Sequence, residues 1–270
     1  MISDITIGQY FPGTSIVHRL DARMKIILVV MLIVTIFLCN NVFSIALMVL
    51  AAVLLVLISK IPFKTVLKSI KPLTVIILIT AVLNIFYGKG EPLVQVGKLK
   101  ITLDGIETAV FMAIRIITLV VISSLLTYTT SPTELTDALE RLMKPLKYIK
   151  IDIHSIAMTM TIALRFIPTL VEEIEKIMSA QKSRGAEMDS GGLINRAKAL
   201  VPVLIPLFVS SFRRANDLAY AMECRCYRGG EGRTKMKVMK MTVKDVVSLI
   251  GVAAFTAVII TVNHFADVIL

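Results

Sequence analysis

Two arginines flanked by small residues carry the clearest recognition chemistry in this sequence. Each stands where a long stretch of helical periodicity stops, so each is expected at the tip of a helix. Small neighbours would let such a tip enter a groove on another protein, where the five donors of a guanidinium group bind carboxylates or carbonyl ends. The alternative is that both are ordinary solvated arginines near helix C-termini, where cations are favoured. The two triplets are Ser183-Arg184-Gly185 and Cys224-Arg225-Cys226.

Two acidic residues stand near these arginines. Glu187 follows the first triplet, and Glu223 directly precedes the second. A carboxylate beside a guanidinium group forms a charge-assisted pair, so we expect these two residues to hold the arginines in place before docking. Two such tips on one chain predict two similar sockets on its partners.

Other chemistry is sparse in the sequence. The three cysteines are too scattered for a disulfide framework and are expected to be reduced thiols. The histidines lie in separate regions, and a single C-x-C pair is a poor zinc site, so no metal is expected. No phosphate-binding loop of the G-x-x-x-x-G-K-[ST] type occurs, so the chain is not expected to bind ATP in that way. We therefore expect a non-catalytic protein without a cofactor of its own.

The elements that must position the arginines belong to a membrane protein. The chain is 56% hydrophobic, against roughly 45–50% for a soluble domain, and the excess falls in long uncharged runs. Its net charge of +11 would suit nucleic acid, but in a membrane protein the enrichment of basic residues on the cytoplasmic side explains it. We expect the lipid bilayer, and no nucleic acid, as a partner.

Five membrane spans are predicted. A single helix through the first two would be about 50 Å long, far more than a bilayer core of about 30 Å, so Asn40-Asn41 predicts a tight hairpin between them. Residues 88–104 are typical of an extracytoplasmic loop with a small hairpin. The predicted spans are residues 26–39, 42–58, 73–87, 106–128 and 246–262.

Basic residues orient these spans. Lysine and arginine gather before the first span, between the second and third, and throughout residues 129–244. Five spans place all three regions on one side, which is the cytoplasm. The N-terminus is then expected inside and the C-terminus outside the cell membrane.

Residues 129–244 form a basic segment that is predicted to be helical. Ser131 is a helix N-cap with Glu134 reaching back, and the helix that follows should end near Lys147. Two longer helices are expected over residues 153–184 and 193–226, stopped by Gly185 and by Gly229-Gly230. One apolar stripe is predicted on the second of these, consisting of Phe208, Phe212, Ala215, Ala219 and Met222.

These long helices set the expected fold class. Their apolar first halves would allow seven spans, but Arg165 and several prolines favour long helices that are partly embedded or packed beneath the spans, because a charge at mid-bilayer is costly. We predict an all-α membrane protein of about five transmembrane helices plus long amphipathic cytoplasmic coupling helices. Its expected parts are residues 1–128, with four spans, residues 129–244, the cytoplasmic region, and residues 245–270, the last span.

Arg115 is a charged residue well inside a predicted span. A charge in the membrane is by default a functional hypothesis. A structural role is favoured here, with Glu107 about two turns away or a polar group of a neighbouring helix as the partner.

Three runs of the sequence resemble one transport family. They are PGTSIVHRLDARMK at 12–25, SRG at 183–185 and AMECRCYRGG at 221–230. In combination they closely resemble EcfT, the transmembrane coupling subunit of energy-coupling factor transporters, which is related to the CbiQ-type cobalt transport subunit. The resemblance covers essentially the whole chain. The family usually has proline at the position of Ala22 and an Ala-Arg-Gly type triplet at 224–226, and both differences keep the side chains small.

The resemblance implies a coupling function. Two ABC-type ATPase subunits would bind ATP and each receive one arginine, either Arg184 or Arg225, in a groove. The same helices would cradle a substrate-binding membrane protein, the S-component, and reorient it so that a vitamin or metal ion is released inside. The N-terminal P-G-x-S pattern favours a vitamin-type system with a shared coupling module.

Two other classes of function are the alternatives. A membrane enzyme would need a convergent acid, base and nucleophile, and no such set stands out. A secondary transporter would need charged or broken spans around a midplane site and an internal repeat, and no repeat is visible among the spans.

Overall fold

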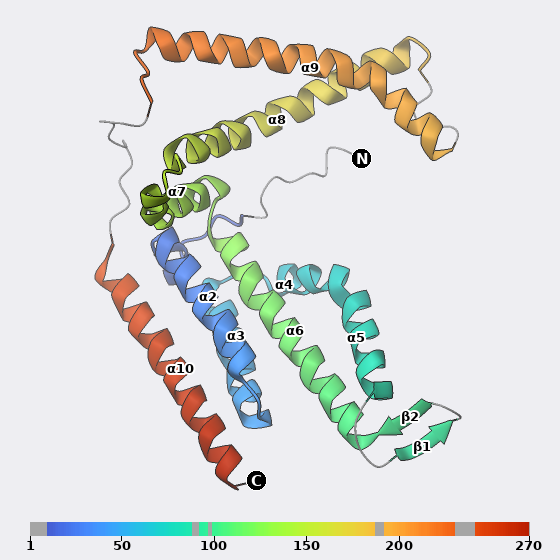
Figure 1. Ribbon diagram of the computed structural model, residues 1–270, viewed down its shortest axis with the longest axis vertical. Helices are drawn as coiled ribbons and strands as arrows, with labels where there is room; N and C mark the ends of the chain where they lie inside the picture. Colours follow the sequence, from blue (N-terminus) through green and yellow to red (C-terminus); the bar gives the residue numbers. More distant parts are fainter. Residues whose placement is uncertain (1–9, 88–91, 97–98, 187–191, 230–240, 270) are drawn as a thin grey trace. The chain divides into compact units, whose positions relative to one another are not determined.

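The computed structural model describes residues 10–87, 92–96, 99–186, 192–229 and 241–269 (Figure 1). These residues divide into two compact units. The bundle unit comprises the described residues up to Leu135 together with the last described range, 241–269. The paired-helix unit comprises the described residues from Thr136 to Gly229. The predicted division into 1–128, 129–244 and 245–270 stays a prediction.

The bundle unit is helical apart from one short hairpin. The two strands of this hairpin pair antiparallel within the predicted extracytoplasmic loop. Its elements are α1 (Ile16–Arg19), α2 (Ala22–Leu38), α3 (Val42–Ser59), α4 (Phe63–Ile70), a 3-10 turn (Lys71–Leu73), α5 (Thr74–Tyr87), β1 (Pro92–Val96), β2 (Leu99–Thr102), α6 (Leu103–Thr129) and α10 (Val243–Ile269).

The predicted hairpin between the first two spans is confirmed. Asp21 caps α2, where its carboxylate accepts the Arg23 backbone N–H at 2.9 Å. α2 then ends at Leu38, three residues before α3 begins at Val42. The first predicted span therefore starts four residues earlier than expected, because its cap lies at Asp21 and not at the first apolar residue.

A small apolar core joins four helices of the bundle unit. Ile36 of α2, Met48 of α3, Ile122 of α6 and Ile259 of α10 are each at most 1% exposed and belong to one cluster. Most other apolar side chains of these helices are exposed or only partly buried. Exposed apolar surface is what a helix needs where it faces lipid.

Five stretches of the described chain are long and apolar enough to cross a membrane. This number and the all-α membrane class agree with the prediction, but one member of the set differs. α2 has only 17 residues, whereas α8 (Ile153–Ser183) qualifies, although it is the least apolar of the five. The five are Val42–Ser59, Phe63–Phe86, Leu103–Thr129, Ile153–Ser183 and Val243–Phe265.

The paired-helix unit begins within α7 (Pro132–Leu142), because the bundle unit ends at Leu135. Ser131 caps α7 as predicted, since its hydroxyl accepts the Glu134 N–H at 3.3 Å. The helix ends at Leu142 and not near Lys147, and a 3-10 turn (Lys144–Ile149) follows. Pro145 gives the reason, because proline lacks the N–H that would continue the helix and disfavours helical geometry in the residue before it.

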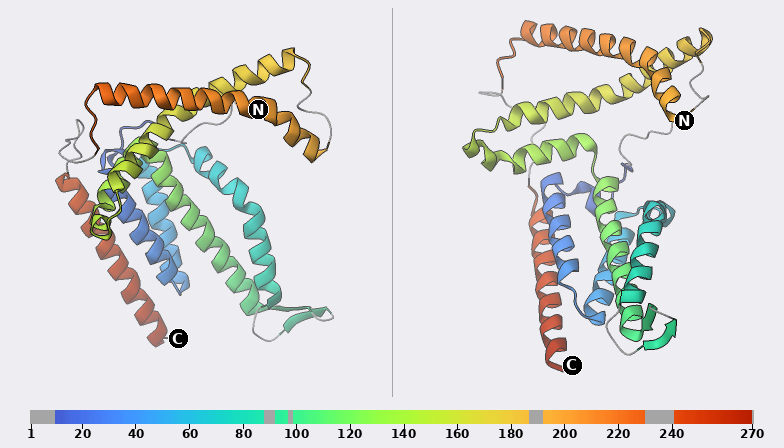
Figure 2. Two further views of the ribbon diagram at one scale, coloured as in Figure 1. Left: turned by 45° about the horizontal axis from the view of Figure 1, so that its top comes forward. Right: turned by 45° about the vertical axis from the view of Figure 1, so that its right-hand side comes forward.

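Two long helices, α8 and α9 (Leu193–Cys224), make up the rest of this unit. They run in opposite directions and cross, as Figures 1 and 2 show. The direction is fixed by contacts: Gln181 late in α8 donates to the Pro202 carbonyl early in α9, whereas Glu173, earlier in α8, pairs with Arg214, later in α9. The two helix ends that carry the arginines therefore point away from each other.

Candidate functional site

Both predicted arginines occupy the same backbone position at a helix end. Arg184 is the C-cap of α8, with φ −87° and ψ 6°. Arg225 is the C-cap of α9, with φ −94° and ψ 17°. The two side chains therefore leave their helices from nearly identical backbone geometry.

The hydrogen bonds around the two arginines also match. At the end of α8 the N–H of Gly185 donates to Lys182 O at 3.0 Å, and the N–H of Ala186 donates to Gln181 O at 3.0 Å. At the end of α9 Cys226 donates to Glu223 O at 2.8 Å, and Tyr227 donates to Met222 O at 3.0 Å. This pair of bonds is the Schellman motif, which satisfies carbonyls that a helix end leaves open.

The Schellman motif needs a left-handed residue directly after the arginine. Gly185 fills this position in the first tip with φ 85°, and Cys226 fills it in the second with φ 57°. Glycine adopts this conformation freely, whereas a residue with a Cβ pays about 1–2 kcal/mol. The predicted stop at Gly229-Gly230 is therefore wrong: α9 ends at Cys224, because Cys226 already takes the left-handed turn.

The two tips are open to a partner. All six residues of the two triplets are exposed, and Cys224 and Cys226 are free thiols. In the described part of the chain neither Arg184 nor Arg225 forms a hydrogen bond or an ion pair through its guanidinium group. Their donors remain available for acceptors on another protein.

The predicted supporting residues are less informative. Glu187 lies outside the described residues. Glu223 is exposed, and within the described part of the chain its carboxylate makes no ion pair with Arg225. The supporting role of both residues stays a prediction.

The distance between the tips follows from the antiparallel pairing. Arg184 stands three residues beyond Gln181, which contacts Pro202 at 3.3 Å. Those three residues and the stretch from Pro202 to Arg225 extend in opposite directions, so at 1.5 Å per residue the two tips lie roughly 40 Å apart along the helix pair. The pair of helices is thus a rod with one arginine at each end.

A polar lock holds the crossing of the two helices. Glu173 of α8 uses both carboxylate oxygens: one accepts the Ser210 hydroxyl, and the other accepts Arg214 of α9 at 2.9 Å from Nη2. The side chains of Arg214 and Glu173 are 41% and 19% exposed, so the pair is partly shielded from water.

The start of α8 is capped by Asp152. The pKa of this carboxyl group is lowered by its hydrogen bonds from Ser155, which favour the ionised form of the cap.

Apolar side chains line the space beside the lock. A hollow of about 250 Å³ lies between Ile162, Phe166 and Leu170 of α8 and the later half of α9. Its α9 side is lined by Ala215, Leu218, Ala219 and Met222, together with Ser211 and Arg214. Three members of the predicted apolar stripe therefore face α8.

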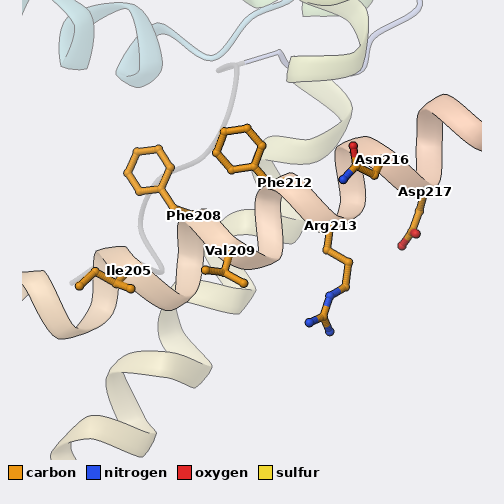
Figure 3. Close-up of a pocket in the computed structure, with 7 residues that line it drawn as sticks. All are labelled: Ile205, Phe208, Val209, Phe212, Arg213, Asn216 and Asp217. Carbon is orange, nitrogen blue, oxygen red and sulfur yellow. The ribbon is translucent and has the colours of Figure 1, made fainter.

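The other two members of that stripe lie on an open surface. Phe208 and Phe212 are 62% and 68% exposed and line a shallow hollow of about 720 Å³ on α9 (Figure 3). Both rings project to one side of the helix, and Arg213 and Asp217 project to the other (Figure 3). The single stripe predicted from the sequence is split, because crossing helices touch along only part of a straight stripe.

Arg115 is part of the bundle unit and not of this site. Its Nη2 donates to the carbonyl of Cys39 at the end of α2, and its guanidinium lies 4.9 Å from the Phe111 ring centroid. A polar group of a neighbouring helix, and not Glu107, is therefore its partner. Asn263 of α10 supports the same turn by donating to Leu38 O and accepting the Ser44 hydroxyl.

The sequence interpretation missed a polar junction at the other end of the bundle unit. The buried Lys25 donates to Thr129 O at 2.8 Å and to His18 O at 3.1 Å. Asp245, 0% exposed at the start of α10, accepts the backbone N–H of Asp21 at 2.9 Å. In the sequence Lys25 is one of the basic residues before the first predicted span, and no local pattern links it to a residue a hundred positions away.

Among the described residues no group of three or more His, Cys, Asp or Glu side chains is suited to hold a metal ion. The exposed arginines at the helix tips offer recognition of acceptor groups by cations.

Comparisons with known proteins agree on one family. The CbiQ model, described as cobalt transport protein, matches residues 13–236. The chain is 54% identical over 246 residues to the energy-coupling factor transporter transmembrane protein EcfT of Ruminiclostridium cellulolyticum, covering 91% of this chain and 92% of that protein. It is 46% identical over 258 residues to EcfT of Bacillus subtilis, covering 94% and 97%. It is 44% identical over 260 residues to EcfT of Listeria innocua, covering 96% and 98%.

Proposed function

This chain belongs to the CbiQ family, as an EcfT-type transmembrane component of energy-coupling factor transporters, and on that premise we propose that it couples ATP hydrolysis by partner subunits to solute uptake. Two ABC-type ATPases bind the ATP, and the chain itself is non-catalytic and carries no cofactor. An S-component binds the substrate, a vitamin or a metal ion, with a vitamin favoured. The protein lies in the cell membrane with its N-terminus inside and its C-terminus outside.

The observation that carries this proposal is the matching geometry of the two helix tips. Arg184 and Arg225 each cap a Schellman motif and are exposed, and their guanidinium groups have no partner within the described chain. Two equivalent projections on one chain fit two copies of similar sockets, one on each ATPase. Carboxylates or helix carbonyl ends in those sockets would accept the guanidinium donors.

The pairing of α8 and α9 supports transmission of movement between the tips and the membrane. Because Glu173 bonds to both Ser210 and Arg214, a displacement of one helix is passed to the other at the crossing. When the ATPases close on ATP, the tips follow their sockets. The exposed Phe208 and Phe212 provide an apolar surface on α9 against which the S-component can rest and be reoriented.

Co-purification tests the proposal. The chain is expressed with and without the two ATPases and an S-component, and is purified by a tag on the chain. The ATPases are expected to co-purify with the unaltered chain, and the Arg184→Glu/Arg225→Glu double variant is expected to lose vitamin or ion uptake, either by losing the ATPases or by uncoupling their ATP hydrolysis.

The matched control reverses the same number of charges elsewhere on the same helices. Arg165→Glu/Arg213→Glu changes exposed arginines of α8 and α9 that lie away from the tips, and it should retain ATPase capture. Transport or substrate turnover by the chain alone would instead indicate a secondary transporter or an enzyme and would overturn the proposal.

A further inference from the structure

A lysine-rich helix connects two spans of the bundle unit. α4 and the turn after it carry Lys64, Lys68 and Lys71, and Lys60 lies between α3 and α4 as the C-cap of α3. No acidic residue occurs between positions 60 and 71. All four lysines are exposed, and none forms an ion pair with any described residue. These four positive charges must therefore be neutralised by a partner outside the chain or be solvated by water alone.

The spacing of residues on α4 separates its surfaces. Residues three or four positions apart share a helix face, so Lys64, Lys68 and Lys71 lie along one edge. Phe63 and Leu67, 64% and 51% exposed, lie along the neighbouring edge. An apolar edge beside a basic edge is the arrangement of a helix that lies in a membrane interface.

The third face of α4 is fixed to the bundle. Val66, only 3% exposed, packs in a cluster with Val56 at the end of α3 and with Leu125 and Tyr128 at the end of α6. The Tyr128 hydroxyl also donates to Thr65 O at 3.2 Å. These contacts hold α4 in one orientation, with its apolar and basic edges turned away from the bundle.

The position of α4 along the chain places it at the membrane boundary. The apolar run of α3 ends at Ser59, where the hydrocarbon core must also end, and α4 follows within four residues. Pro72 then interrupts the helical ladder, and Figure 1 shows α4 lying across the end of α5 and not in line with it. Although Phe63–Phe86 is long enough to be one span, its first turns therefore lie along the interface.

We propose that α4 is a binding surface for anionic phospholipid. Lys64, Lys68 and Lys71 bind the phosphate-bearing headgroups, while Phe63 and Leu67 insert among the upper parts of the acyl chains. Lysines near an anionic membrane surface each contribute about a fivefold preference, the equivalent of about 1 kcal/mol. Bound anionic lipid would anchor the junction of α3, α4 and α6 at a fixed depth.

The absence of tryptophan from the chain allows a direct test. The count of tryptophans is zero, so a Phe63→Trp substitution gives a single tryptophan, on the apolar edge, whose fluorescence is excited selectively at wavelengths that tyrosine does not absorb. The full chain is reconstituted in phosphatidylcholine bilayers with a minor fraction of phosphatidylglycerol, and either one lipid or the other is brominated to quench the fluorescence. Brominated phosphatidylglycerol is expected to quench well beyond its share of the bilayer.

Lysine variants then test whether the lysines of α4 cause the preference for phosphatidylglycerol. In the Phe63→Trp background, Lys64→Gln/Lys68→Gln/Lys71→Gln is expected to lower the preference for phosphatidylglycerol at least tenfold. The corresponding Lys→Arg triple variant should keep it, because the charge is retained. High salt should weaken it, because exposed charges are screened.

A second reporter supplies the control. Phe43, 78% exposed near the start of α3, lies at the opposite end of that helix and has no lysine between it and Ser59. A Phe43→Trp variant should be quenched by each lipid in proportion to its share of the bilayer, and the same proportional quenching in the glutamine variant shows that the bundle is still inserted. The proposal is overturned if neither lipid quenches the Phe63→Trp variant, if both quench it in proportion to their amounts, or if the preference survives the glutamine substitutions.

Discussion

Lys25 of α2 and Arg115 of α6 each cap the C-terminal end of the other's helix. Lys25 donates to Thr129 O, the last carbonyl of α6, and Arg115 donates to Cys39 O, the carbonyl that closes α2. The two helices are antiparallel, and the spacing agrees: fourteen positions separate 25 from 39, and fourteen separate 115 from 129. Each cation thus lies at the negative end of a helix dipole. It also donates a hydrogen bond to a carbonyl for which lipid tails offer no donor.

This reciprocal capping predicts that Arg115 stabilises the bundle and does not act on substrate. Arg115→Met leaves the Cys39 carbonyl without its charged donor, and the chain should lose about 1.5–3 kcal/mol of stability. Arg115→Lys keeps a donor and should lose less. The measurement is thermal unfolding of the purified protein in detergent, with ATPase co-purification of any folded fraction unchanged.

An exposed cation gives the control for Arg115. Lys244→Met, in the first turn of α10, removes a positive charge from the surface and should leave the melting temperature nearly unchanged. A melting temperature for Arg115→Met equal to that of Lys244→Met would show that the Arg115–Cys39 contact contributes nothing.

The Glu173 lock predicts energetic coupling between α8 and α9. Glu173→Ala and Arg214→Ala should each reduce the hydrogen-exchange protection of both helices, and the double variant should cost less than the sum. The expected coupling is about 1 kcal/mol, because the pair is partly exposed and screened by water. Glu172→Ala changes an exposed neighbour and should leave protection intact; additive single effects would argue against the lock.

The left-handed residues of the two tips predict opposite responses to substitution. Cys226→Gly relieves a strained backbone and should strengthen the Schellman bond from the Tyr227 N–H by about 1 kcal/mol. Gly185→Val imposes the strain and should weaken the bond from the Ala186 N–H by a similar or larger amount. Exchange rates of these two amides provide the measurement.

Cys224, two positions before Cys226, provides a control that separates backbone strain from thiol chemistry. Cys224→Ala removes the other exposed thiol at a helical position, so the Tyr227 amide should exchange as before. Equal rates in the Cys226→Gly and unaltered chains would mean that the second tip stores no backbone strain.

Local signals in the sequence were enough for much of the fold. Asn40-Asn41 located the first hairpin because no helix through it fits a bilayer, and Ser131 and Gly185 located helix ends because capping depends on neighbouring residues. The positions of Arg184 and Arg225 at helix tips followed from the same local rules.

Tertiary relationships were beyond those rules. The partner of Arg115 lies 76 positions away on another helix, and no periodicity connects the two residues. The stripe through Phe208 and Ala215 was split because the crossing angle of α8 and α9 depends on packing, which a helical repeat does not encode. The end of α9 was misplaced because a cysteine, and not a glycine, adopts the left-handed turn.

The equivalence of the two tips makes the most specific prediction about the proposed coupling role. Arg184 and Arg225 share backbone geometry and lie roughly 40 Å apart along the rod, so they should act alike and independently. Arg184→Glu and Arg225→Glu are each expected to weaken ATPase binding by factors that agree within about threefold, and the double variant by roughly their product, because distant sites are additive. Titration of the detergent-purified chain with the ATPases measures these affinities, and Arg165→Glu serves as the single-charge control. If one variant abolishes binding while the other leaves it unchanged, the tips are not equivalent, and a single arginine carries the attachment.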